Sequence, residues 1–177
     1  MKVINNIDRE VYYVQNPAIG AAVLWKFIYG YYLKENKMIP FPLLFIVLPI
    51  ILREDLCTAI KSTQKKKGLS KVSEKLFKDK KNDDLYTINK SAIELRPLTL
   101  SSFNIGISAR LFSIDILTAQ VFPLAHTRKP RLSPSTKDLL DAAEKLGMWC
   151  SELSLLEICE WLKVCLLYTS DAADDRI

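Results

Sequence analysis

The sequence predicts a mainly α fold, a compact helical domain that carries a small β-ribbon. Apolar residues recur at helical spacing in most segments of the 177-residue chain. Asn16–Pro17 and Ser133–Pro134 are typical of helix starts, because each places a capping side chain before a proline. Only residues 116–125 are short, β-branched and bounded by a proline, which indicates a strand. The hydrophobic content of 49% is enough for one sizeable core.

The first predicted helix covers residues 15–36. Asn16 is its expected N-cap and Pro17 its first helical residue. Its apolar residues follow a helical period, and small residues at 20–22 let another element approach closely. We expect a largely buried helix whose apolar stripe packs in the core rather than around a cofactor.

Residues 38–52 are the most apolar part of the chain. They contain no charged or polar side chain, and the run ends abruptly at Arg53. A membrane-spanning helix needs about 20 apolar residues, and this run is shorter and interrupted by Pro40, Pro42 and Pro49. The sequence therefore predicts a short buried helix from Pro42, broken near Pro49 and resumed through residues 53–62. One question stays open: whether all of residues 41–52 are core, or one face is a docking surface.

Lysines dominate the next segment. Residues 61–81 hold nine lysines against only Glu74 and Asp79. We expect a loop at residues 65–68, followed by a helix with lysines on its outer face. The favoured interpretation is a solvated amphipathic helix, and the alternative is a surface that contacts nucleic-acid phosphates or a partner. The candidate contacts are Lys65, Lys66, Lys67, Lys71, Lys75 and Lys78.

Two further helices are predicted within residues 82–115, separated at Arg96–Pro97, with Thr99 or Ser101 as cap of the second. Residues 116–125 are the expected strand. Residues 126–132 are either the returning strand of a ribbon or a loop.

The last predicted helices form a pair. One opens at Ser133–Pro134 and is expected to end near Gly147. The other opens with Ser154 and Glu157, which match a capping box. Together with the β-prone residues 162–164, this pair is consistent with a winged-helix-like arrangement.

The residues give little support for catalysis. His126 is the only histidine, so one chain offers neither a triad nor a two-histidine metal site. The cysteines form no CxxC pair, and no glycine-rich phosphate loop is present. The sequence therefore predicts a protein that is not an enzyme and that has no catalytic residues, cofactor or metal. The cysteines, expected to be ordinary buried thiols, are Cys57, Cys150, Cys159 and Cys165.

The order and spacing of several segments is similar to one known family. The segments read "YYVQNPAIGAAVLWKFIYGY", "PFPLLFIVLPIILRED", "ELRPLTLSSFNIGISARL" and "AAEKLGMWCSELSLLEICEWLKV". Over residues 10–164 the chain resembles the middle component of bacterial three-component ABC-ATPase systems. The resemblance implies a cytoplasmic adaptor, outside the membrane, between an ABC ATPase of the chromosome-maintenance and repair type and a variable third (effector) component. It also implies a role in bacterial defence against phages or other mobile DNA.

The end of the chain differs in character. Residues 165–177, "CLLYTSDAADDRI", resemble the translated sequence of an adaptor used in sequencing libraries. We therefore expect one middle-component domain at residues 1–164, followed by a non-native tail at 165–177.

Overall fold

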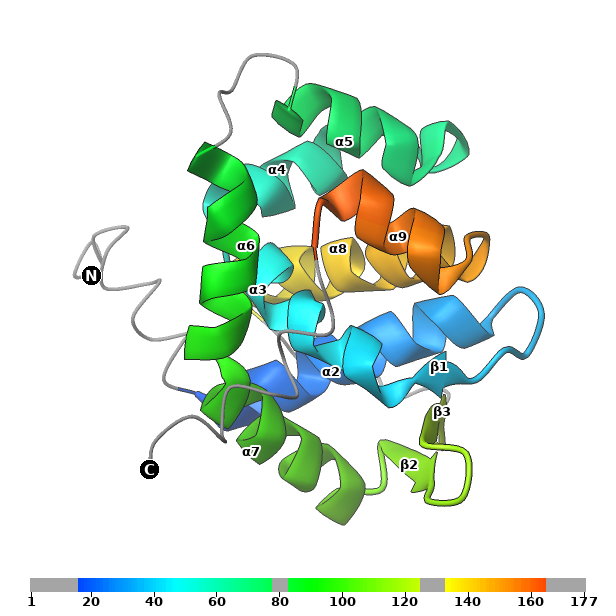
Figure 1. Ribbon diagram of the computed structural model, residues 1–177. Coiled ribbons are helices and arrows are strands. Elements are labelled where there is room, and N and C mark those ends of the chain that lie inside the picture. Colours follow the sequence, from blue (N-terminus) through cyan, green and yellow to red (C-terminus); the bar gives the residue numbers. More distant parts are fainter. Residues whose placement is uncertain (1–15, 78–82, 125–132, 165–177) are drawn as a thin grey trace, which may run out of the picture.

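The computed structural model describes residues 16–77, 83–124 and 133–164 (Figure 1). Helices form most of it, and a three-stranded antiparallel sheet lies at one side, which confirms the predicted mainly α fold with a small β-ribbon. The helices are α2 (Pro17–Tyr32), α3 (Val47–Ile51), α4 (Glu54–Ser62), α5 (Gly68–Phe77), α6 (Asp83–Glu94), α7 (Arg96–Ser108), α8 (Pro134–Ser151) and α9 (Leu155–Leu162), with the 3-10 helices η1 (Phe41–Ile46) and η2 (Lys65–Lys67).

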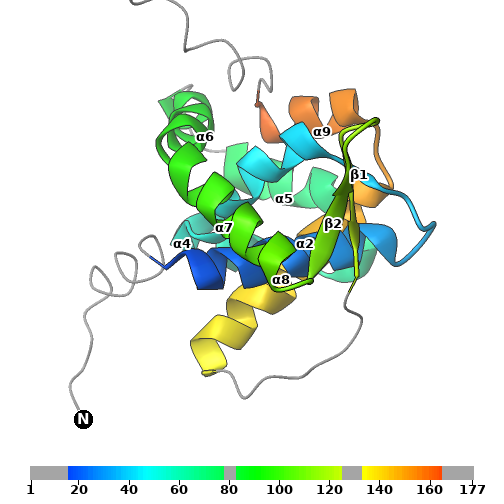
Figure 2. The same cartoon turned by 90° about the horizontal axis from the view of Figure 1, so that it is seen from below.

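Helix α2 runs through the middle of the molecule and packs against both α7 and α8 (Figures 1 and 2). It begins as predicted, because the Asn16 side chain accepts hydrogen bonds from the backbone N–H groups of Ala18 (3.0 Å) and Ile19 (3.3 Å). Most of its apolar side chains are buried, including Leu24, Phe27 and Ile28. The predicted core role of this helix is confirmed.

Two glycines bring the backbones of α2 and α8 into contact. A Cβ on Gly30 would lie 2.1 Å from the carbonyl oxygen of Glu144, and a Cβ on Gly147 would lie 2.1 Å from that of Phe27. The prediction that α8 ends near Gly147 is therefore wrong, since α8 continues to Ser151. Gly147 serves the close approach to α2 rather than a helix end.

Most of the apolar run at residues 38–52 is core, although Met38 and Pro42 are exposed. Phe45 is 7% exposed, and Ile46 and Ile50 are each 2% exposed, so these side chains offer no docking face. The predicted break near Pro49 is wrong, because α3 continues through it and the chain breaks at Leu52–Arg53. Pro49 is tolerated because it lies in the first turn of α3, where a proline ring fits. Within the described residues, no helix combines the length and apolar character needed to cross a membrane.

The sheet has the order β1-β3-β2, with β1 at Ile39–Pro40, β2 at Phe112–Asp115 and β3 at Gln120–Pro123. Two predictions are wrong here. The predicted helix to residue 115 ends at Ser108, and the predicted strand at 116–125 begins only at Gln120.

Packing explains the early end of α7. The Phe112 ring lies directly over Gly106, where a Cβ would be 2.1 Å from the ring. Arg110 takes a positive φ of 55°, and the Leu111 N–H donates to the Gly106 carbonyl (2.9 Å), so the chain reverses into β2. The cap predicted at Thr99 or Ser101 is also wrong, because Leu95 is the N-cap and makes no side-chain cap bond.

The last two helices form the predicted pair. Ser154 and Glu157 make the reciprocal bonds of a capping box at the start of α9. Lys163 ends α9 in the left-handed conformation, so residues 162–164 do not continue as a strand. The winged-helix-like form of the pair stays a prediction. His126, the return segment 126–132 and the tail 165–177 lie outside the described residues, so the predicted domain limits stay predictions as well.

Candidate interaction surfaces

Three of the six candidate lysines lie next to one another on a short 3-10 helix. Lys65, Lys66 and Lys67 form η2 between α4 and α5, and all three side chains are exposed. Gly68 follows with a φ of +71°, a backbone conformation that favours glycine, and α5 starts there. The predicted loop at 65–68 is therefore a 3-10 turn and a glycine bend.

The other candidate lysines differ in their surroundings. Lys71 forms an ion pair with Glu74 one turn further along α5. Lys75 instead donates to two hydroxyl oxygens at the end of α4, those of Ser62 (3.2 Å) and Thr63 (3.0 Å). Lys78 lies outside the described residues. Among the described lysines of the prediction, Lys71 is thus the one whose charge is offset by a carboxylate.

The structure adds a lysine that sequence reasoning missed. Lys145 of α8 is partly buried, and its ammonium donates to the carbonyl oxygens of Ile60 (3.1 Å), Lys61 (3.0 Å) and Thr63 (2.8 Å). It thereby caps the C-terminal end of α4, where helix carbonyls lack partners and the dipole favours a cation. Burial lowers the pKa of Lys145, and the charges of Lys65 and Lys75 lower it further.

Trp149, one turn after Lys145 on α8, fixes the position of η2. Its indole N–H donates to the carbonyl oxygen of Lys65 (2.8 Å), and the Lys145 ammonium lies 5.7 Å from the ring centroid. Only 3% of Trp149 is exposed. A tryptophan on an apolar helix face gives no local signal of this role, because its partner is distant in the sequence.

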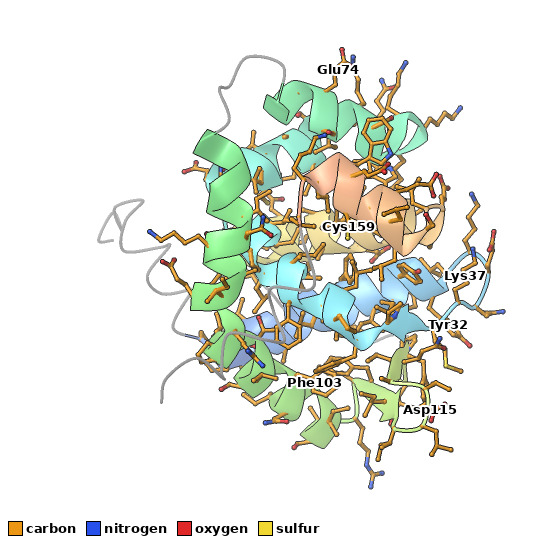
Figure 3. All side chains as sticks on the ribbon, viewed as in Figure 1. Tyr32, Lys37, Glu74, Phe103, Asp115 and Cys159 are labelled. Atoms are coloured by element: carbon orange, nitrogen blue, oxygen red, sulfur yellow. The ribbon has the colours of Figure 1, made fainter. Side chains whose placement is uncertain are left out.

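The tip of the β2–β3 hairpin is a second surface that the sequence did not reveal. Ile116 is 86% exposed and Leu117 is 96% exposed. The turn is held by Asp115, whose carboxylate accepts from the Leu117 N–H (3.0 Å) and the Thr118 hydroxyl (2.7 Å). These bonds, the Thr118 hydroxyl bond first, lower the pKa of Asp115. Figure 3 shows Asp115 at the outer edge of the sheet, away from the helical core.

The hairpin is also anchored to the core. The Phe41 N–H, at the start of η1, donates to the carbonyl oxygen of Ala119 (2.9 Å). Because residues 116–125 were predicted as one strand, the sequence did not indicate an exposed turn. A strand would have paired the backbone of Ile116 and Leu117 with a neighbouring strand. The Asp115–Thr118 spacing is the available signal for a turn.

Helix α9 carries a third set of exposed apolar side chains. Leu156 is 70% exposed, Leu155 is 41% exposed and Trp161 is 40% exposed. Ile158 and Leu162 of the same helix are buried. α9 lies beside α5 (Figure 1).

The described residues contain no group of three or more His, Cys, Asp or Glu side chains that could hold a metal ion. Burial raises the pKa of Cys150 to about 12, so its thiol stays protonated at neutral pH. Burial also raises the pKa of Cys57. Protonated, enclosed thiols are poor nucleophiles.

Comparison with known proteins gives the family. No curated protein and no solved structure matches the chain. The model of the family described as ABC-three component (ABC-3C) system Middle Component 3 matches residues 4–166, which is most of the chain. The helices, the sheet and all the surfaces described above lie within that match, and the chain belongs to the Middle Component 3 family of ABC-three component systems.

Proposed function

We propose that this protein is a non-enzymatic adaptor of an ABC-three component system. It links an ABC ATPase of the chromosome-maintenance and repair type to a variable third component, and it acts in the bacterial cytoplasm against phages or other mobile DNA. Membership of a middle-component family supports a role among partner proteins. The observation that carries the docking role is the exposed tip of the β2–β3 hairpin, residues 116 and 117.

The tip has the properties of an interface anchor. An isolated chain exposes nearly all of Leu117, and burying a leucine side chain contributes about 1.5–3 kcal/mol. Asp115 already orders the turn, so little conformational entropy is lost when a partner binds. Most of the apolar run 41–52 is not available for docking, because its side chains from Leu43 to Ile51 are buried in the core.

Co-purification with the products of neighbouring genes tests the proposal. We expect the full chain to form a complex with the ABC ATPase at micromolar concentration. We expect the Ile116→Ser/Leu117→Ser variant to bind at least about tenfold more weakly, because two central apolar contacts are lost. Its Tm should match that of the wild type, because neither side chain is buried.

The control is an Ile93→Ser/Leu100→Ser variant. These residues of α6 and α7 are 46% and 39% exposed, so the change replaces two partly exposed apolar side chains away from the hairpin, with about half the exposure of the hairpin pair. We expect it to bind normally. A wild-type chain that binds neither the ATPase nor the third component contradicts the adaptor role. Normal binding by the hairpin variant contradicts the hairpin as the docking site.

A further inference from the structure

Five lysines from α5, α8 and η2 gather where α4 ends. We call them the lysine surface: Lys65, Lys66, Lys67, Lys75 and Lys145. We propose that the lysine surface binds the phosphate backbone of duplex nucleic acid without reading its sequence. The exposed lysines contact the phosphates, whereas Lys145, whose three N–H donors bind carbonyl oxygens, contributes charge alone.

Hydrogen bonds show that the surface is a single assembly. Thr63, only 2% exposed, receives the Lys145 ammonium on its carbonyl oxygen (2.8 Å) and the Lys75 ammonium on its hydroxyl oxygen (3.0 Å). Two cations therefore converge on one residue. Lys65 follows two residues later in the chain, and its carbonyl oxygen is bound by Trp149. Side chains of α8 thus hold in place the segment from which η2 projects.

The charges of the lysine surface are not balanced. Neighbouring lysines have carboxylate partners, since Lys61 pairs with Asp138 (2.5 Å) and Lys71 pairs with Glu74. Within the described part of the chain, no carboxylate forms an ion pair with any of the five lysines. Burial is the main cause of the lowered pKa of Lys145, and repulsion from Lys65 and Lys75 lowers this pKa further. A bound anion would offset this repulsion.

The side chains of the lysine surface are better suited to binding a phosphate backbone than to binding a protein. Protein interfaces have an apolar centre. No large apolar side chain is exposed in η2, in the described side chains of α5 or at the end of α4. The exposed chain neighbours of these lysines, Gln64 and Glu74, are polar or charged, and Glu74 forms its ion pair with Lys71. Figure 3 shows nitrogen-tipped side chains projecting from this end of the molecule, near the labelled Glu74.

The lysine side chains also indicate which part of a nucleic acid the surface recognises. Lysine ammonium groups act as point charges on phosphates, whereas base readout commonly uses the planar donors of arginine, asparagine or glutamine. No arginine belongs to the surface, and Trp149, the aromatic residue that binds the Lys65 carbonyl, is buried. Its ring is therefore unavailable for stacking on unpaired bases, which favours a duplex over a single strand.

Salt-dependent binding of the full chain to a fluorescent DNA duplex of arbitrary sequence tests the proposal. Each phosphate contact contributes about 0.9 to the slope of log affinity against log salt concentration. We expect the Lys65→Gln/Lys66→Gln/Lys67→Gln variant to show a slope whose magnitude is smaller by about 2 to 3. Its affinity for the duplex at low salt should be at least about tenfold lower. Its Tm should not fall, because the three side chains are exposed.

The matched control is Lys34→Gln/Lys37→Gln/Lys90→Gln. It removes the same charge, but these exposed lysines pair with Glu152, Glu35 and Glu94. We expect the control to keep most of the affinity. A control variant that loses as much as the site variant overturns the proposal, because total charge alone then explains binding. Absence of salt-dependent binding by the wild type overturns it as well.

A charge-neutral variant tests the contribution of α8. Trp149→Phe removes the donor to the Lys65 carbonyl and leaves every lysine in place. We expect up to about a fivefold loss of affinity with an unchanged salt slope, since one hydrogen bond is lost but no charge. Unchanged affinity would contradict the role of Trp149. If the partner ATPase or an acidic peptide binds through these lysines and the duplex does not, the surface is a protein-binding site and the proposal is wrong.

Discussion

Ser102 carries a buried hydroxyl that has no hydrogen-bond partner among the described residues. The residue is 0% exposed, and its Oγ faces α2, where a Cβ on Gly20 would lie 2.1 Å away. A buried polar atom without a partner costs free energy. We expect Ser102→Ala to increase the free energy of unfolding by about 1 kcal/mol, measured by urea denaturation.

Ser151→Ala is the matched control for that prediction. Ser151 is equally buried at 2% exposure, but its Oγ donates to the Met148 carbonyl (2.8 Å). Its loss should lower stability by about 1 kcal/mol. Equal destabilisation by both variants would contradict the prediction that the Ser102 hydroxyl lacks a hydrogen-bond partner.

The buried thiol of Cys150 makes the free energy of unfolding fall as the pH rises into the alkaline range. Burial raises the pKa of its thiol from 9.0 to about 12. In the unfolded chain the thiol loses its proton first, so ionisation favours unfolding. The contribution of Cys150 is therefore complete below about pH 9 and is lost as the pH rises towards 12. We expect Cys150→Ala to flatten this part of the curve of unfolding free energy against pH.

The half-buried Cys159 is the matched control for Cys150. Cys159→Ala should leave the alkaline slope in place. If the slope of the Cys150→Ala variant equals that of the wild type, other buried groups such as Tyr31, whose pKa burial also raises, account for it.

At the scale of elements, the α2–α8 crossing depends on its glycines. A methyl group at Gly147 would meet the Phe27 carbonyl, which is backbone and cannot rotate away. We expect Gly147→Ala to lower the free energy of unfolding by about 1–3 kcal/mol, because the helices must move apart. Asp141→Ala, at an exposed position of α8, should stay within about 0.5 kcal/mol of the wild type. Similar stability for both variants would show that the crossing adjusts without cost.

Element starts were predictable from the sequence where the chemistry is local. The caps at Asn16, Ser133 and Ser154 act within three residues of themselves, so their sequence context carries the signal. The sequence predictions were wrong where packing against distant residues determines the end of a helix. The path of α8 through Gly147 depends on Phe27, and the early end of α7 depends on the Phe112 ring. A single sequence does not show which distant residue packs against each of these positions.

Across the whole molecule, the candidate surfaces were foreseeable only in part. The density of charge around residues 65–67 is visible in the sequence. The contributions of Lys145 and Trp149 are not, because folding brings α8 against the end of α4. The exposed hairpin tip was hidden because its apolar residues looked like strand residues.

The two proposed surfaces lie far apart. Figure 1 places α5 at one end of the molecule and the β2–β3 hairpin at the other. Substitutions at distant sites without shared partners usually have additive effects. Substitutions at one proposed surface should therefore leave binding at the other unchanged.

The anchoring of the hairpin has a consequence for evolution. Asp115, Thr118 and the Phe41–Ala119 bond set the shape of the turn, while the side chains of Ile116 and Leu117 support nothing inside the fold. Under the proposed docking role, mutations at these two positions therefore escape selection for foldability and are selected through the proposed partner. A lineage could exchange one partner for another by changing two codons, with the helical scaffold inherited intact.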